Sequence, residues 1–145
     1  MDDTKYNTLL VAHVAGFLHD TYGQGKEWPP DMSMGLGVMQ AVAGRLRRED
    51  FADFVQCLVD ARARSHWLLP DTLLTRLSGP IGRRFPGTPP AGIGQAARLL
   101  SAVAESLPES DFETLVDATT AGLDIMQDVE QDVERRLKAR EPVRA

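Results

Sequence analysis

The three histidines are the residues whose spacing can be tested first for metal or acid–base chemistry. His13 and His19 are six positions apart, so on a helix they face different ways, whereas a helical metal pair needs a spacing of three or four. His13 and Asp20 share a face but make only two ligands. His66 precedes Trp67 at an expected helix end, where an imidazole can cap carbonyl groups. The spacing therefore predicts no metal site, and we interpret each histidine as structural or exposed.

Nucleophile and phosphate-loop patterns are also lacking in the sequence. Cys57 is the single cysteine, and it lies in an apolar run with no histidine at a recognisable motif spacing. The serines stand in no nucleophile motif. The Gly-x-Gly pairs at 35–37 and 92–94 lack the third glycine of a dinucleotide loop and follow no expected strand. We interpret these glycines as places where two helices approach closely, and we predict no catalytic residue and no cofactor.

A basic residue, an aromatic residue and a proline occur together at two places in the chain. Lys26 stands near Trp28 at the first, and Arg83 and Arg84 precede Phe85 at the second. In a structural interpretation, each ring plugs the end of a helical unit and the proline after it sets the turn. In a functional interpretation, these side chains are binding anchors on exposed loops. We prefer the structural interpretation and keep all five as candidate interaction residues.

The C-terminal segment carries a pattern with a period of four. The sequence Gln-Asp-Val-Glu at 127–130 recurs at once at 131–134, and basic residues follow the acidic ones. On a helix this order complements the dipole, so a solvated helix surface explains the carboxylates better than a metal site does. A helix over 111–140 would be about 45 Å long and would overhang a small domain. We therefore expect a dimer contact along its narrow apolar ridge, which consists of Met126, Val129, Val133 and Leu137.

Apolar residues at spacings of three and four predict helices throughout the chain, and no alternating run predicts a sheet. Asp50 with Asp53 is expected to cap the third helix, and a Ser-x-x-Glu box beginning at Ser110 the last. Gly79 and Pro80 are expected to end the fourth helix and to open a loop that reaches residue 94. The predicted helices cover about 4–22, 34–48, a third from 50, a short fourth after 71, 96–107 and 111–140.

An internal similarity suggests how these helices are organised. At a spacing of 57 residues, 25–29 aligns with 82–86 and Leu-Val-Asp-Ala at 58–61 aligns with 115–118. The interpretation is a single all-α domain over 1–145, a helical bundle of about six helices. It would contain two tandem pseudo-equivalent three-helix units at about 4–66 and 68–124, a C-terminal helix extension over 125–140 and a frayed tail at 141–145. Coincidence remains the alternative to duplication.

Composition narrows the class of protein. The chain has 145 residues, of which 43% are hydrophobic and 26% are charged, as is typical of a globular domain. A net charge of −5 and a pI near 5.1 argue against nucleic-acid binding, which needs basic residues to neutralise phosphates. The apolar stretch at 9–18 is too short to span a bilayer and follows acidic residues. Together with the single cysteine, this favours a cytoplasmic protein.

These observations favour a non-catalytic protein-interaction or regulatory module, similar in character to an adaptor or inhibitor, whose partner is another protein. A homo-oligomer formed through the C-terminal helix is part of this expectation. The alternative function is small-molecule binding in a pocket between the two units. An enzyme whose site is assembled only in three dimensions ranks third. The pocket of the alternative function would be lined by Met32, Met34, Met39, Trp28 and Phe85.

Overall fold

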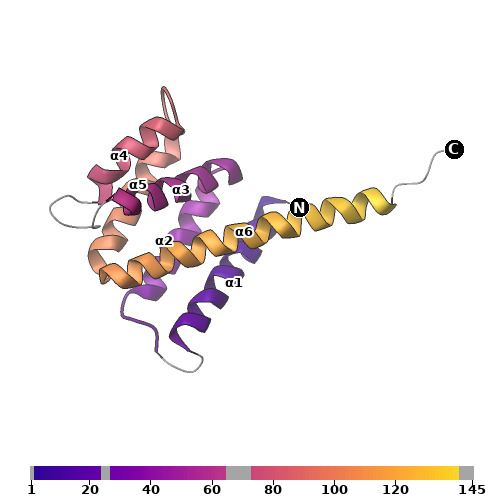
Figure 1. Cartoon of the computed structure of the whole chain (residues 1–145), viewed down its shortest axis with the longest axis horizontal. Helices are drawn as coiled ribbons and strands as arrows, with labels where there is room; N and C mark the ends of the chain where they lie inside the picture. The colour runs from indigo at the N-terminus through magenta and orange to yellow at the C-terminus, as the bar shows by residue number, and fades with distance from the viewer. Residues whose placement is uncertain (1, 24–26, 65–72, 141–145) are drawn as a thin grey trace.

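The structure is a computed structural model, which describes residues 2–23, 27–64 and 73–140. Within these residues all regular secondary structure is α-helix, which confirms the predicted all-α fold with a long C-terminal helix (Figure 1). None of the described helices is both long enough and apolar enough to cross a membrane. The six helices are α1 (Asp3–Tyr22), α2 (Met32–Arg45), α3 (Arg48–Arg64), α4 (Leu73–Arg84), α5 (Ala91–Ser106) and α6 (Glu109–Arg140).

Helix α4 corrects the expectation that Gly79 and Pro80 end a helix, since it continues to Arg84. Pro80 is buried on the same face as Leu77, so packing against the core favours a continuous helix despite the missing N–H. Gly79 helps because a residue without a Cβ avoids the clash that a proline imposes on the residue before it. The predicted loop is therefore limited to the segment between Arg84 and Ala91.

Two predicted caps were also wrong. Helix α3 begins at Arg48 and α6 begins at Glu109, so Asp50 and Ser110 lie inside first turns rather than at cap positions. The amide nitrogen of Phe112 donates instead to the Pro108 carbonyl, at 3.0 Å. Acidic residues in these first turns still complement the helix dipole. Each pattern therefore marked a helix start, but the predicted cap lies three residues too late in α3 and two residues too late in α6.

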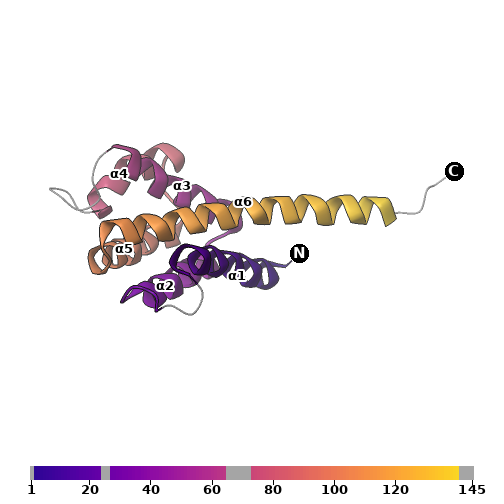
Figure 2. The ribbon, with the colours of Figure 1, turned by 60° about the horizontal axis from the view of Figure 1, so that its bottom comes forward.

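The first and last helices pack antiparallel along much of α1. At one end the Tyr22 hydroxyl donates to Asp111 at 2.8 Å, and burial together with this bond raises the pKa of Tyr22. In the middle, Gly122 of α6 faces Val14, and a Cβ added to this glycine would lie 2.9 Å from Val14 Cγ2. Gly122 therefore lets the two backbones approach closely. Figure 2 shows α1 and α2 on one side of α6, with α3 and α4 on the other.

Helices α2 and α5 also pack antiparallel, and a glycine near the start of each meets a leucine just past the end of the other. A Cβ on Gly35 would lie 3.5 Å from Leu107 Cδ1, and one on Gly92 would lie 2.7 Å from Leu46 Cδ2. Close approach of helices is thus found at these two glycines. The second glycine of each Gly-x-Gly pair, at 37 and 94, faces open space.

Burial in α2 and α3 recurs in α5 and α6 at a constant spacing. Every buried residue between positions 31 and 61 lies 61 positions before another buried residue, as with Met32 and Ile93 or Phe51 and Phe112. At a spacing of 57, Met32 would correspond instead to Pro89, which is partly exposed. Equivalent buried positions are therefore 61 residues apart. This spacing differs by four residues, about one helical turn, from the spacing of 57 that aligns identical residues.

We predict opposite effects on stability for two glycine substitutions in helices. Gly122→Ala should lower the free energy of unfolding by about 1–2 kcal/mol, because the stiff Val14 side chain must move. Gly16→Ala is the control, since nothing lies within 4 Å of its added Cβ. It should raise stability by about 0.5–1 kcal/mol through helix propensity. Urea titration of both variants checks this, and a stabilising Gly122→Ala would contradict the close contact between α1 and α6.

Candidate functional site

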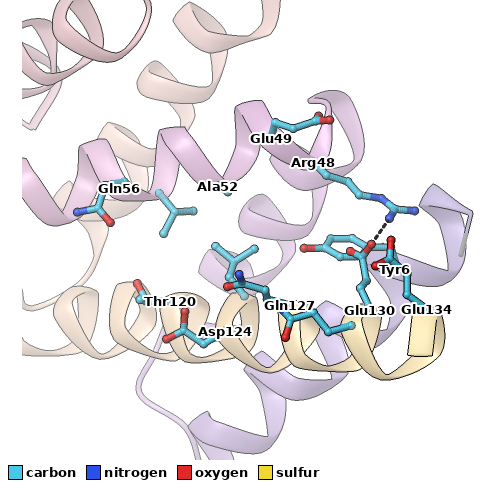
Figure 3. A pocket seen from close by; sticks show the side chains of 13 residues that line it. Tyr6, Arg48, Glu49, Ala52, Gln56, Thr120, Asp124, Gln127, Glu130 and Glu134 are labelled. Carbon is cyan, nitrogen blue, oxygen red and sulfur yellow. Dashed lines mark hydrogen bonds and ion pairs between the residues drawn. The ribbon is translucent and has the colours of Figure 1, made fainter. Parts of the chain in front are cut away.

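A groove of about 460 Å³ lies between α3 and α6, with Tyr6 of α1 at one end (Figure 3). Its base is apolar, because Val55 is only 2% exposed and Leu123 is half-buried. Carboxylates and amides surround this base. The lining residues are Tyr6, Arg48, Glu49, Ala52, Val55, Gln56, Thr120, Leu123, Asp124, Gln127, Glu130, Gln131 and Glu134.

Arg48 joins the three helices that form the groove. Its Nε donates to Asp3 Oδ1 at 2.8 Å and its Nη1 donates to Glu130 Oε2 at 3.0 Å. Its guanidinium carbon lies 4.4 Å from the centroid of the Tyr6 ring. Because the Arg48 side chain is only 24% exposed, this cation–π contact and the Glu130 bond are partly shielded from water. Arg48 therefore fixes the start of α3 against both α1 and α6.

Tyr6 is nearly buried, at 6% exposure, where it borders the groove. Burial raises its pKa, the nearby carboxylate of Glu130 raises it further, and the positive charge of Arg48 opposes both. The phenol thus stays protonated near neutral pH. Its role in the groove is to supply an apolar wall and a ring face for Arg48.

The groove carries an excess of negative charge. Four carboxylates and one guanidinium line it, and the guanidinium is occupied by Asp3 and Glu130. Asp124, Glu49 and Glu134 are exposed along its edges. An apolar base with acidic edges attracts a ligand that combines an apolar face with positive charge.

The residues that the sequence singled out near Trp28 and Phe85 lie away from this groove. Phe85 is 8% exposed, and Trp28 is half-buried with its ring 4.8 Å from that of His19. Arg84 is paired with Asp53 of α3 at 3.4 Å, and Arg83 is exposed. Lys26 lies outside the described residues. The Phe85 ring thus occupies the position expected of a plug.

The C-terminal ridge divides into a buried part and an exposed part. Met126 is fully buried, so it belongs to the core and cannot contact a second chain in this fold. Val129 and Val133 are half-buried, and Leu137 is 59% exposed. Both views show the last turns of α6 projecting beyond the other helices (Figures 1 and 2).

The side chains proposed for a pocket between the two units do not line the groove. Met32 and Met39 are buried in the core, at 0% and 3% exposure, whereas Met34 is 43% exposed. These three methionines, Trp28 and Phe85 are also absent from the lining of the three smaller described cavities, which lie along α1.

The described residues hold no group of three or more His, Cys, Asp or Glu side chains arranged to bind a metal ion. Cys57 is fully buried, and desolvation raises the pKa of its thiol to about 11. A thiol with this pKa is almost entirely protonated at neutral pH and is a poor nucleophile.

No sequence pattern links Tyr6, Arg48 and Glu130. Each was seen only as part of a helix pattern, and the three lie on α1, α3 and α6. The available signal was local: Arg48 marked the end of the predicted helix 34–48, and Glu130 belonged to the repeated Gln-Asp-Val-Glu. Their convergence depends on tertiary packing.

Comparison with known proteins adds no relative: no protein-family model, curated protein or solved structure gives a significant match to this chain.

Truncating the Phe85 ring should test its role as a plug. Phe85→Ala should lower the free energy of unfolding by about 3–5 kcal/mol, as truncation of core aromatics does. Replacing Lys26, Arg83 and Arg84 together by Ala is the control, because exposed ion pairs contribute less than about 1 kcal/mol. Thermal unfolding followed by circular dichroism measures both. A Phe85→Ala chain as stable as the natural one would indicate a binding anchor instead.

Cys57 should report on unfolding of α3. The raised pKa of its thiol means that the protonated form is favoured by folding, so this contribution is complete below pH 9 and is lost as the pH rises toward 11. At pH 9, where an ordinary cysteine is half ionised, the native chain should react with a thiol reagent far more slowly than the urea-unfolded chain. Equal rates would show that α3 opens readily.

Proposed function

We propose that this chain is a non-catalytic protein-interaction module and that its groove binds a basic, amphipathic helical segment of a partner. The observation that carries this proposal is the combination of a base containing Val55 and Leu123 with acidic edges on both sides. Binding of a helix in a groove uses an apolar contact for affinity and peripheral charges for specificity.

The chemistry of the lining supports binding rather than turnover. The one guanidinium already contacts two carboxylates, and Tyr6 keeps its proton because burial raises its pKa. The edge carboxylates Asp124 and Glu134 are exposed to water, where they attract cations over a short range that salt reduces. The volume is within the range of specific ligand sites, and the lining runs from Thr120 to Glu134 along α6, a length that suits a helical ligand.

Binding to synthetic helical peptides tests this function. A peptide with leucines on one face and lysines or arginines on the flanks should bind, and its affinity should fall as salt is added. A peptide with the same leucines and glutamates on the flanks is the control and should bind at least about tenfold more weakly. Fluorescence anisotropy of the labelled peptides measures both affinities.

Two charge-reversal variants test whether the basic peptide binds in the groove. The groove-reversed variant, Asp124→Lys with Glu134→Lys, should weaken binding of the basic peptide by at least about tenfold, because it removes two attractive charges and adds two repulsive ones. Asp20→Lys with Glu105→Lys changes the net charge equally on exposed positions of α1 and α5 and should retain binding. Equal losses in both variants would place the binding outside the groove.

A further inference from the structure

The last turns of α6 have the properties that the groove requires of its ligand. Residues 135–140 are helical and exposed, and they carry Arg135, Arg136, Lys138 and Arg140 without an acidic residue. Leu137 adds an apolar side chain that is 59% exposed. We propose that the partner is a second copy of this chain, whose basic α6 end enters the groove. This inference rests on the proposed function and names the partner of the same site.

The charge order along α6 fixes the direction of such a pairing. Residues 124–134 carry five acidic residues and no basic one, and the basic residues follow directly. Two α6 helices packed in parallel would place the basic ends beside each other. If they pack antiparallel about a two-fold axis near Asp132 and Val133, residues 125–130 of each copy lie beside the basic residues 135–140 of the other, and only residues 131–134 face the same segment of the second copy. The dimer then has two equivalent contacts between acidic and basic residues, one on each side of the axis.

The position of the groove along α6 agrees with this axis. Gln127, in the groove, is six residues before Val133, and the residue beside it in the second copy would be six after, within the basic end. The groove of each copy therefore receives the end of the other, which closes the dimer and leaves no end to form a filament. Leu137 of the second copy would lie opposite position 128, next to Gln127 of the groove lining.

Ion pairs within one copy do not prevent this association with a second copy. The Arg136 guanidinium lies 3.1 Å from Asp132 of the same helix, but both side chains are more than half exposed. Such i,i+4 pairs contribute only tenths of a kcal/mol in water. Arg48 is held by Asp3 and Glu130, so much of its positive charge is offset where the second helix would pass.

A charge-swap experiment on the full chain tests the dimer. The tip-reversed variant carries Lys138→Glu and Arg140→Glu, and the groove-reversed variant carries Asp124→Lys and Glu134→Lys. Sedimentation should show the natural chain approaching twice its 15.9 kDa as concentration rises. Each variant alone should remain monomeric, and an equimolar mixture should form a heterodimer because the reversed charges match again. A monomeric natural chain, variants that dimerise like it, or a monomeric mixture would each overturn the proposal.

The same variants separate this inference from the proposed function. The tip-reversed variant keeps its groove intact, so it should bind the basic peptide. If it binds the peptide while the natural chain stays monomeric, the groove is a binding site and the second copy is not its ligand. If the charge swap restores a dimer but the basic peptide does not bind, the groove serves self-association and the broader interaction function fails.

Discussion

The close contact between α1 and α6 is the constraint on which the site depends. Gly122 lets the backbone of α6 approach Leu10 and Val14, and Tyr22 is joined to Asp111 at one end of the pair. This contact brings the N-terminal residues alongside α6, although the two segments are far apart in sequence. Asp3 and Tyr6 thereby reach Glu130, and Arg48 of α3 is held among all three. Without this antiparallel packing the groove would have no third wall.

Burial recurs in part of the core and not in all of it. Helices α2 and α3 share with α5 and α6 one pattern of buried positions at a spacing of 61. Val14 and Leu18 of α1 are also buried, although the residues 61 positions after them are exposed. The groove combines Val55, one of the recurrent buried positions, with Tyr6 of α1.

Local periodicity predicted most of the fold and little of the site. The spacing of Tyr6, Leu10 and Val14, and of Phe51, Phe54 and Leu58, predicted helix faces that are buried. Leu9, assigned to the first of these faces, is 39% exposed. The same local reasoning failed at Pro80, because its burial in the core favours a helix where local propensity predicts a break.

Features that depend on contacts among three separate helices could not be predicted from local sequence patterns. Arg48 has no motif around it, and Gly122 lies inside a regular helix, where a glycine gives no turn signal. The ridge residues were also not equivalent, because only packing distinguishes buried Met126 from exposed Leu137.

The central claim is that two copies join antiparallel through the ends of α6, and distances between spin labels on the two copies test it most directly. Labels would be placed, one position at a time, at exposed Asp132 and at Arg140. Near the axis, at position 132, the two labelled backbones should lie about 10 Å apart. At position 140 the separation should be larger by more than about 10 Å, because the rise of 1.5 Å per residue acts in opposite directions on the two copies. Equal separations at both positions would indicate a parallel pair, and the absence of any coupling between copies would indicate a monomer; either result would contradict the account.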